Sequence, residues 1–330
     1  MPLRRAFPLT VVLALLAGCG GSSSQSPATR SAPDSSGLGG QSAPRTTSVP
    51  AAPPQGSARG LTVGISDQGA AFFTSPLFRT LHLTHARLVV SYDTVAVKFE
   101  RQLVDTWLAQ ARAAGVEPFV TFSHSRVHPT KLPSVAEFTA AFKAFRARYP
   151  DVRVYAAWNE INHKSQPTAD APARAAAYYN VVRANCSGCT VVAGDLLDQA
   201  GAERYLARYV PRLDAAGGPG RVWGLHNYSD TNRFRDSGTT RFLAAVKGDV
   251  WLTETGGVAR FGRAFPFSLT RQARAITYMV RLARSQPRIK RLYVYNWAGA
   301  PADARFDSGL TNADGTPRPA YGALRRALGR

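Results

Sequence analysis

Two glutamates in this chain each follow directly on a short apolar segment. Glu160 comes after the segment 155–159, and Glu254 comes after the segment 250–253. Two carboxylates that meet in one site can divide acid–base and nucleophilic work, because different surroundings push their pKa values apart. This chemistry needs both side chains on one face of the fold, although 94 residues separate them in the sequence. The elements that carry the two glutamates therefore decide whether such a pair forms.

From Leu61 onward the chain repeats one unit, a short β-rich segment followed by an amphipathic or alanine-rich segment. Several of the β-rich segments are continuously apolar, which is typical of parallel strands covered on both faces. The eight predicted strands are Leu61–Ile65, Arg87–Ser91, Pro118–Ser123, Val152–Trp158, Thr190–Gly194, Val222–His226, Val250–Thr253 and Leu292–Trp297. The helical segments between and after them include Val104–Ala114, Val135–Arg148, Ala171–Ala184, Glu203–Ala215, Thr239–Ala245, Arg271–Arg284 and Ala320–Leu328.

Eight such units predict an α/β fold of one kind, a closed (β/α)₈ TIM barrel over residues 61–330. Parallel strands need crossovers of this type, and roughly 250 residues is the usual size of the barrel. A doubly wound open sheet is the alternative. That fold usually has a glycine-rich turn after its first strand, and the segment 64–69 lacks this fingerprint. In a barrel, functional residues gather at the C-terminal ends of the strands.

Polar and aromatic side chains occur at the predicted strand ends. Besides the two glutamates, they are Arg87, His124, Asn159, His226, Tyr228 and Trp297. Glu117 and Asp195 also lie at strand edges, but no partners of this kind accompany them, and we assign them no role. His124 and His128 are four residues apart, yet Pro129 indicates a loop, so no metal site is expected there.

The ordered set of these residues resembles the signature of the clan A glycoside hydrolases, retaining enzymes built on a (β/α)₈ barrel. The resemblance covers residues 61–330. It rests on Asn159-Glu160 after one strand, His226-x-Tyr228 two strands later, Glu254 at the end of the seventh strand and Trp297 on the eighth. The resemblance implies hydrolysis of O-glycosidic bonds in an oligo- or polysaccharide, without a cofactor or a metal.

The resemblance also implies a role for each matching residue. Glu160 corresponds to the acid/base, Glu254 to the nucleophile, and Asn159 to the partner of the sugar 2-hydroxyl. Tyr228 and Arg87 would hold Glu254 ionised and oriented, because a nearby guanidinium favours the charged form of a carboxyl group. His226 would adjust the pKa of Glu160, and His124 would lie at a position that is commonly polar. Trp297 would form a stacking surface under the bound sugar.

The first 60 residues differ in composition from the rest. Arg4 and Arg5 precede an apolar run over 6–17, which has the length of a signal peptide and is too short to span a bilayer. The run ends in Leu16-Ala17-Gly18-Cys19, which resembles a bacterial lipobox. We therefore expect a lipoprotein signal peptide over 1–18, lipidation of Cys19 and an exported protein anchored to the cell membrane. The alternative is an ordinary signal peptide that happens to contain a cysteine.

Residues 19–60 are rich in serine, proline and glycine and poor in large apolar groups. Such a composition predicts a flexible linker between the lipid and the barrel. Beyond Cys19 the chain has two further cysteines, Cys186 and Cys189, and an even number in an exported protein favours a disulfide. A thioredoxin-like redox site is the alternative, but this pair lies between a helical pattern and a strand, without the strand-then-helix context of that motif.

The charge is strongly basic, with 41 Lys+Arg and 21 Asp+Glu over the whole chain. Residues 61–330 retain 36 basic and 20 acidic side chains, a net charge of +16. This excess is compatible with an anionic glycan as partner. Compositional drift toward arginine is the preferred explanation, since only six of the 41 basic residues are lysines. No block of five like charges occurs, so nucleic-acid binding is not expected.

Three functions remain open on the sequence alone. The first is a retaining glycosidase tethered to the outside of a bacterial membrane, acting as a monomer. The second is a catalytically silent barrel that binds envelope carbohydrate. The third, a nucleic-acid binder driven by charge, is the least supported.

Overall fold

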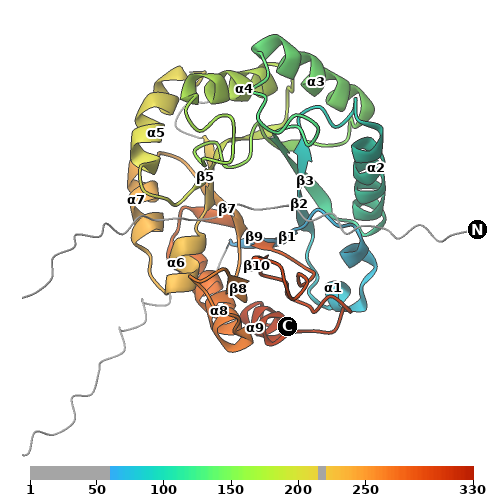
Figure 1. The fold of residues 1–330 in the computed structure, drawn as a ribbon, viewed down its shortest axis with the longest axis vertical. Helices are drawn as coiled ribbons and strands as arrows, with labels where there is room; N and C mark the ends of the chain where they lie inside the picture. The colour runs from blue at the N-terminus through green and yellow to red at the C-terminus, as the bar shows by residue number, and fades with distance from the viewer. Residues whose placement is uncertain (1–59, 215–220) are drawn as a thin grey trace, which may run out of the picture. The chain divides into compact units, whose positions relative to one another are not determined.

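A computed structural model of the chain describes residues 60–214 and 221–330. Eight parallel strands form a closed barrel in the order β1-β2-β3-β4-β5-β6-β7-β9, with the helices outside it (Figure 1). The barrel strands are β1 (Thr62–Ser66), β2 (His85–Ser91), β3 (Glu117–Ser123), β4 (Val154–Ala156), β5 (Thr190–Leu197), β6 (Val222–His226), β7 (Val250–Thr255) and β9 (Ile289–Tyr295). This architecture confirms the predicted (β/α)₈ barrel.

Helices lie between successive strands and follow the last one. They are α1 (Pro76–Thr80), α2 (Lys98–Ala113), α3 (Val135–Arg148), α4 (Pro172–Ala184), α5 (Ala202–Tyr209), α6 (Tyr228–Arg233), α7 (Ser237–Ala245), α8 (Leu269–Ser285) and α9 (Pro319–Ala327), with two 3₁₀ turns, Ala71–Thr74 and Val210–Arg212. No helix within 60–214 or 221–330 combines the length and the apolar character needed to cross a membrane.

Two helices differ from their predicted bounds for visible reasons. Helix α2 begins six residues before the predicted start, because Phe99 and Leu103 are exposed and obscure the amphipathic pattern of its first turns. Helix α5 ends at Tyr209, before the predicted end at residue 215, where Pro211 occupies a 3₁₀ turn. Proline lacks the N–H that would continue an α-helix.

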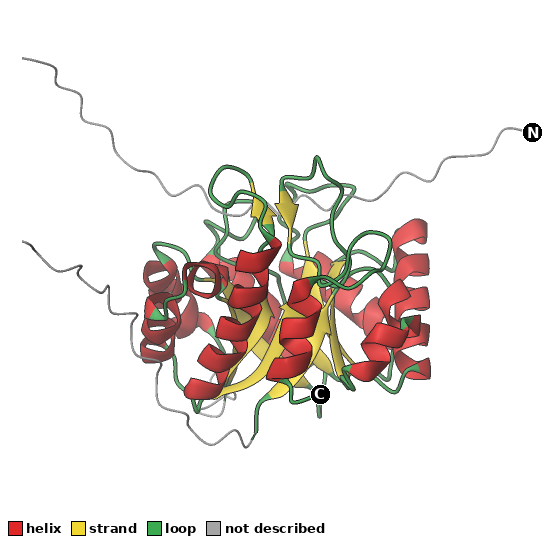
Figure 2. Cartoon of the chain, turned by 90° about the horizontal axis from the view of Figure 1, so that it is seen from below, coloured by secondary structure: helices red, strands yellow, loops and turns green. Residues whose placement is uncertain are grey.

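Several short elements are not indicated by the sequence pattern. Besides α1 and α6, they include a two-stranded antiparallel sheet of β8 (Arg260–Phe261) and β10 (Phe306–Asp307). Figure 2 shows these two strands above the barrel, at the end where most of the long loops gather. Elements of two to six residues carry too little periodicity for a pattern to indicate them.

The core has two layers. One apolar cluster packs inside the barrel and consists of Phe119, Val154, Ala156, Val192, Trp251 and Tyr293. Between the strands and the helices lies a larger cluster, in which the ring of Phe122 on β3 contacts Phe138, Phe142 and Phe145 on α3 at centroid distances of 5.1–5.9 Å. The filled interior leaves the C-terminal rim of the strands as the place for a site.

The predicted disulfide is present between Cys186 and Cys189, in the turn between α4 and β5. The predicted signal peptide, the lipidation site Cys19 and the linker up to residue 59 lie outside the described residues. The division of the chain at residues 18 and 60 therefore stays a prediction.

Candidate active site

The two predicted carboxylates meet at the C-terminal rim of the barrel. Glu160 follows β4, Glu254 lies near the end of β7, and their exposed fractions are 2% and 1%. One oxygen of each carboxylate and one ring nitrogen of His226 all lie within 4.8 Å of one another. Carboxyl groups about 5–5.5 Å apart permit direct attack by one of them, whereas about 6.5–9.5 Å leaves room for an intervening water. The approach of the two carboxylates to within 4.8 Å favours the first arrangement.

Arg87 on β2 organises the site from inside the barrel. Its side chain is fully buried, and Nη1 donates to Oε2 of Glu254 at 2.6 Å. Nη2 donates to Oδ1 of Asn159 at 2.7 Å and to Oδ2 of Asp195 at 2.8 Å. The planar guanidinium holds several acceptors in fixed directions, so Arg87 links the ends of β4, β5 and β7.

Tyr228 completes the surroundings of Glu254. As the first residue of α6, it donates its hydroxyl to Oε1 of Glu254 at 3.1 Å. Both oxygens of Glu254 thus accept a hydrogen bond, one from Arg87 and one from Tyr228. These donors fix the carboxylate in one orientation and favour its ionised form.

Glu160 has different surroundings. Its Oε1 lies 3.2 Å from Nδ1 of His226, and its Oε2 lies 3.8 Å from Nδ1 of His163. Its backbone has φ = 45°, in the left-handed region that non-glycine residues seldom adopt. Such conformations persist where the surrounding structure holds them, and they cluster at functional sites.

Burial separates the protonation behaviour of the two glutamates. Desolvation, followed by the charge of Glu254, raises the pKa of Glu160 well above its usual value. Desolvation also raises the pKa of Glu254, but the charge of Arg87 and the hydrogen bonds from Arg87 and Tyr228 oppose this rise. These surroundings favour the protonated form of Glu160 and, relative to Glu160, the ionised form of Glu254.

His226 is neutral in this site. Burial, together with the charge of Arg87, lowers its pKa well below the usual value. A neutral imidazole beside a protonated carboxyl group can accept its hydrogen bond without taking a permanent charge. His226 is therefore positioned to influence the protonation of Glu160.

Asp195 is a site residue that the sequence analysis left unassigned. Its Oδ2 accepts from Arg87 and, at 3.3 Å, from the hydroxyl of Thr121. The pairing of β5 with β6 shifts register between Val192 and Asp195, and this irregularity breaks the regular in–out alternation along β5. The signal in the sequence was a carboxylate at the end of an otherwise apolar strand.

Trp297 does not occupy the predicted place. Its ring packs against Phe78 at 5.8 Å and Phe72 at 6.2 Å, and its exposed fraction is 7%. Strand β9 ends at Tyr295, so the alternation does not extend to residue 297. Burial and then the charge of Glu254 raise the pKa of Tyr295, whose hydroxyl is thus near the carboxylates. The structure corrects the prediction: Trp297 belongs to the core, and Tyr295 is the aromatic residue of β9 at the site.

His124 follows β3, and Asn159 lies in the segment after β4. Asn159 is buried and accepts from Arg87. His124 is half-buried, with Nδ1 3.1 Å from Oε1 of Gln166, which also accepts from Nε1 of Trp158. Gln166 thus ties the loop after β3 to the loop after β4.

The cluster of Glu160, His226 and Glu254 has the composition and spacing of a metal-ligand set. The guanidinium of Arg87, however, contributes a positive charge 2.6 Å from Glu254. A divalent cation bound there would be repelled by it at short range. A pair of carboxyl groups that divide the roles of acid and nucleophile accounts for the arrangement better than metal binding does.

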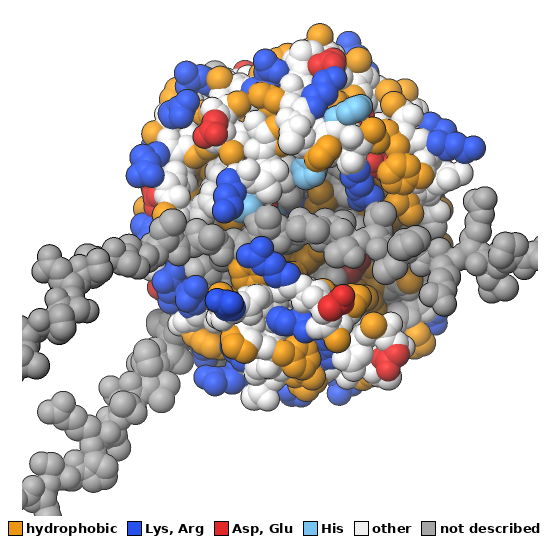
Figure 3. Space-filling model, viewed as in Figure 1, with side chains coloured by type: hydrophobic (Ala, Val, Ile, Leu, Met, Phe, Trp, Pro, Cys, Tyr) orange, Lys and Arg blue, Asp and Glu red, His pale blue; other side chains and the backbone are white. Residues whose placement is uncertain are grey.

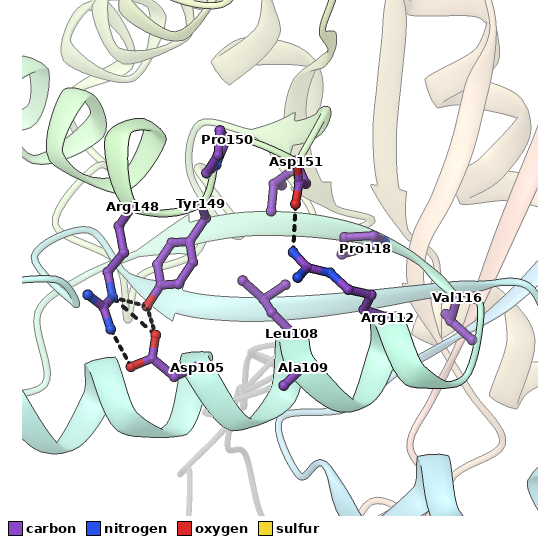
Figure 4. Close-up of a pocket in the computed structure, with 11 residues that line it drawn as sticks. Asp105, Leu108, Ala109, Arg112, Val116, Pro118, Arg148, Tyr149, Pro150 and Asp151 are labelled. Carbon is purple, nitrogen blue, oxygen red and sulfur yellow. Dashed lines mark hydrogen bonds and ion pairs between the residues drawn. The ribbon is translucent and has the colours of Figure 1, made fainter.

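A separate cavity of about 480 Å³ opens between α2 and the chain that follows α3 (Figure 4). Val116 and Pro118 at the start of β3 line it, so it lies at the N-terminal end of the strands, opposite the glutamates. Its two arginines are paired, Arg112 with Asp151 and Arg148 with Asp105, both at 2.6 Å. It therefore has no charge arrangement suited to catalysis.

Comparisons with known proteins agree with this geometry at the level of the fold. No family model and no curated protein sequence matches the chain. Solved structures do match: the GH5_18 protein from Streptomyces cattleya has a TM-score of 0.59 and 15% identity, with 83% of this chain and 81% of that chain covered. At such low identity the likeness shows the fold alone, a (β/α)₈ barrel like that of these solved glycoside hydrolases.

Two further structures show the same likeness. The family 39 glycoside hydrolase from Bacteroides cellulosilyticus has a TM-score of 0.54 and 16% identity, with 81% of this chain covered. This chain spans 63% of the length of that protein. The GH128 endo-β-1,3-glucanase from Amycolatopsis mediterranei, solved with laminaripentaose, has a TM-score of 0.53 and 17% identity, with 81% of this chain and 99% of that chain covered.

Proposed function

We propose that this protein is a glycoside hydrolase that cleaves O-glycosidic bonds with retention of anomeric configuration. The observation that carries the proposal is the carboxylate pair, with oxygens within 4.8 Å and with opposite hydrogen-bonding surroundings. Glycoside hydrolysis of the retaining type needs one protonated and one ionised carboxyl group at this spacing. The names of the structural neighbours, a xylanase, a β-xylosidase, a glucanase and a mannanase among them, support the same class of reaction.

The first step of the proposed reaction uses both glutamates. The Glu254 carboxylate attacks the anomeric carbon while Glu160 gives its proton to the glycosidic oxygen, which leaves as an alcohol. A covalent glycosyl ester on Glu254 results. Asn159, held by Arg87 at 2.7 Å, is placed to hydrogen-bond the sugar 2-hydroxyl.

The second step regenerates the enzyme. Glu160, now ionised, takes a proton from water, and the oxygen of that water attacks the anomeric carbon. The ester bond to Glu254 breaks, and Glu254 leaves as a carboxylate. Two inversions at one carbon give net retention.

We further propose that the enzyme is exported and anchored by lipid on Cys19 to the outer face of a bacterial membrane. The lipobox-like segment 16–19 supports the anchor, and the linker 19–60 would hold the barrel away from the membrane. The Cys186–Cys189 disulfide fits an oxidising compartment outside the cytoplasm.

The test of the catalytic proposal is turnover on a panel of aryl glycosides and polysaccharides. Replacing Glu160→Gln removes the acid, and kcat/KM is expected to fall roughly 10²–10⁴-fold. Glu254→Ala removes the nucleophile and is expected to abolish turnover, with Glu203→Gln on the exposed face of α5 as the matched control. The anomer released first, followed by ¹H NMR, should have the configuration of the substrate.

Two results would contradict the catalytic proposal. Unchanged turnover in the Glu254→Ala variant would show that Glu254 is not the nucleophile. A first product with inverted anomeric configuration would contradict the double-displacement mechanism. Glycan binding without hydrolysis of any substrate on the panel would instead favour a silent carbohydrate-binding barrel.

A further inference from the structure

The stretch of chain after Glu254 has an unusual charge. Residues 255–302 contain nine Lys and Arg and no Asp or Glu. In the fold, this stretch runs through β8, the turn 262–268, helix α8 and strand β9. Basic side chains gather over β8, β10 and the neighbouring helices on the face that carries the site (Figure 3). A local excess of this kind differs from the general basic character of the protein.

Arginines and phenylalanines interleave on this surface. The guanidinium of Arg233 lies over the ring of Phe265 at 5.4 Å, and that of Arg305 lies over Phe261 at 5.3 Å. Such stacking holds a guanidinium in place while its N–H groups remain free to bind an anion. We define the arginine platform as Arg233, Arg263, Arg274 and Arg305 with the rings of Phe265 and Phe267.

The four arginines of the platform are exposed and carry uncompensated charge. Within the described part of the chain, none of the four forms an ion pair with a carboxylate. Asp307, on β10 beside the platform, is buried and bound by both terminal nitrogens of Arg318 at 2.8 and 2.9 Å. Uncompensated arginines at a rim attract anions and raise their local concentration.

The platform is continuous with the catalytic site. Phe306 on β10 contacts the ring of Phe261 at 5.9 Å on one side. On the other side it contacts Tyr228 at 6.0 Å and Tyr295 at 6.2 Å, the two tyrosines near Glu254. The small β8–β10 sheet therefore lies beside the tyrosines that surround Glu254, and Arg305 of the platform stacks on Phe261 of this sheet.

Among the residues that the structure describes, the cation in direct contact with the carboxylate pair is not free to bind an acidic substrate group. Arg87, the cation that touches the pair, is engaged by Glu254 at 2.6 Å and by Asp195 at 2.8 Å. An acidic group on the sugar that is cleaved would meet these two carboxylates. An acidic group on a flanking sugar would instead reach the arginine platform.

We propose that the substrate is an anionic glycan, and that the arginine platform binds carboxylate or sulfate groups on sugars next to the cleaved bond. This inference rests on the proposed glycosidase function for the cleaved bond, but the binding it describes can be measured separately. Phe267, 55% exposed, offers a ring on which the C–H face of a sugar can pack. The combination of exposed rings, unpaired arginines and a sheet that contacts the tyrosines around Glu254 favours a glycan over a nucleic acid.

The test measures binding by the full-length chain carrying Glu160→Gln, so that hydrolysis does not consume the probe. Two matched probe pairs distinguish the acidic groups: polygalacturonate against its carboxyl-reduced form, and dextran sulfate against dextran. The double variant Arg263→Gln/Arg305→Gln is compared with Arg208→Gln/Arg325→Gln, which removes the same charge near the C-terminal ends of α5 and α9. A short DNA duplex serves as a third anion.

In at least one pair, the acidic glycan is expected to bind more tightly than its neutral form. The platform variant should raise the Kd of that glycan about tenfold, at a few-fold per exposed charge pair, and the control variant less than about twofold. An equal rise in Kd in both variants would show that net charge alone causes the effect, and this result would overturn the proposal. Equal affinity for acidic and neutral glycans, or tighter binding of the duplex at physiological salt, would also overturn it.

Hydrolysis measured in parallel with the unmodified chain separates this inference from the proposed function. Platform-dependent binding of an acidic glycan without cleavage of any substrate would refute the glycosidase and leave the binding site standing. Cleavage of neutral glycosides without preference for acidic ones would support the glycosidase function and refute the proposed anionic substrate.

Discussion

At the scale of single residues, the site consists of two similar side chains in different surroundings. Glu254 accepts hydrogen bonds from Arg87 and Tyr228, whereas Glu160 faces the imidazoles of His226 and His163. Burial raises the pKa of both glutamates, and the two donors on Glu254 keep its pKa below that of Glu160. Activity should therefore be bell-shaped in pH, since it is lost below the pKa of Glu254 and above that of Glu160.

Tyr228→Phe should shift only the acidic limb of this profile. The hydroxyl of Tyr228 stabilises ionised Glu254, so its removal raises the pKa of Glu254 and moves the acidic limb upward by roughly 1 pH unit. Tyr205→Phe, which removes a buried hydroxyl bonded to the carbonyl of Thr168, is the control. The measurement is kcat/KM against pH, and an acidic limb that stays in place would contradict the role of Tyr228.

Asp195→Asn should move both limbs in the opposite direction. The negative charge of Asp195 raises the pKa of Glu160 and of Glu254. Asparagine keeps an acceptor for Arg87 and removes that charge, so both pKa values fall and the whole profile shifts to lower pH. A drop in kcat with an unshifted profile would show that Asp195 only positions Arg87.

At the scale of elements, the site depends on close contact between β5 and β6. Gly224 on β6 leaves room for Asp195, because a Cβ at residue 224 would lie 2.1 Å from Oδ1 of Asp195 and 2.8 Å from the carbonyl of Gly194. The register shift in β5 brings Asp195 to this position. An inward carboxylate thus requires a glycine on the neighbouring strand.

Gly224→Ala should lower the free energy of unfolding by about 1–3 kcal/mol, because the backbone of β5 cannot move away easily. It should also reduce kcat/KM by displacing Asp195. Gly322→Ala on α9 is the matched control, since a Cβ there approaches only the flexible end of Arg326 at 3.3 Å. That variant should be stabilised by up to about 1 kcal/mol, as expected of glycine replaced inside a helix. Denaturant unfolding measures the free energy of unfolding of both variants, and an equal change in the two would contradict the packing argument.

At the scale of the whole molecule, the barrel and the first 60 residues have separate tasks in the proposed function. The barrel carries the chemistry, and the segment 1–60 determines where that chemistry takes place. Cys19 is the residue on which the anchor depends.

Cys19→Ser should release the protein from the membrane fraction of cells that express it. The unmodified chain should incorporate radiolabelled palmitate and sediment with membranes, because two or more acyl chains anchor a protein stably. Cys186→Ser is the control for replacement of a cysteine elsewhere in the chain. Equal partition of both variants into the membrane fraction would contradict the lipid anchor.

The sequence by itself determined the fold class and the central pair. Parallel strands covered on both faces are continuously apolar, so all eight barrel strands could be located, and the glutamates that follow two of them could be placed on one rim. Helix α3 was predicted at its observed bounds, Val135–Arg148. These features depend on local pattern, which a single sequence contains.

The tertiary structure decided the rest of the site. Asp195 turns toward Arg87 because of a register shift between strands, and Trp297 joins the core because β9 ends at Tyr295. The difference in pKa between Glu160 and Glu254 arises from burial and from donors on other strands. The arginine platform joins segments around residues 233, 265 and 305. Each of these features depends on contacts between distant parts of the chain, which no periodicity in the sequence records.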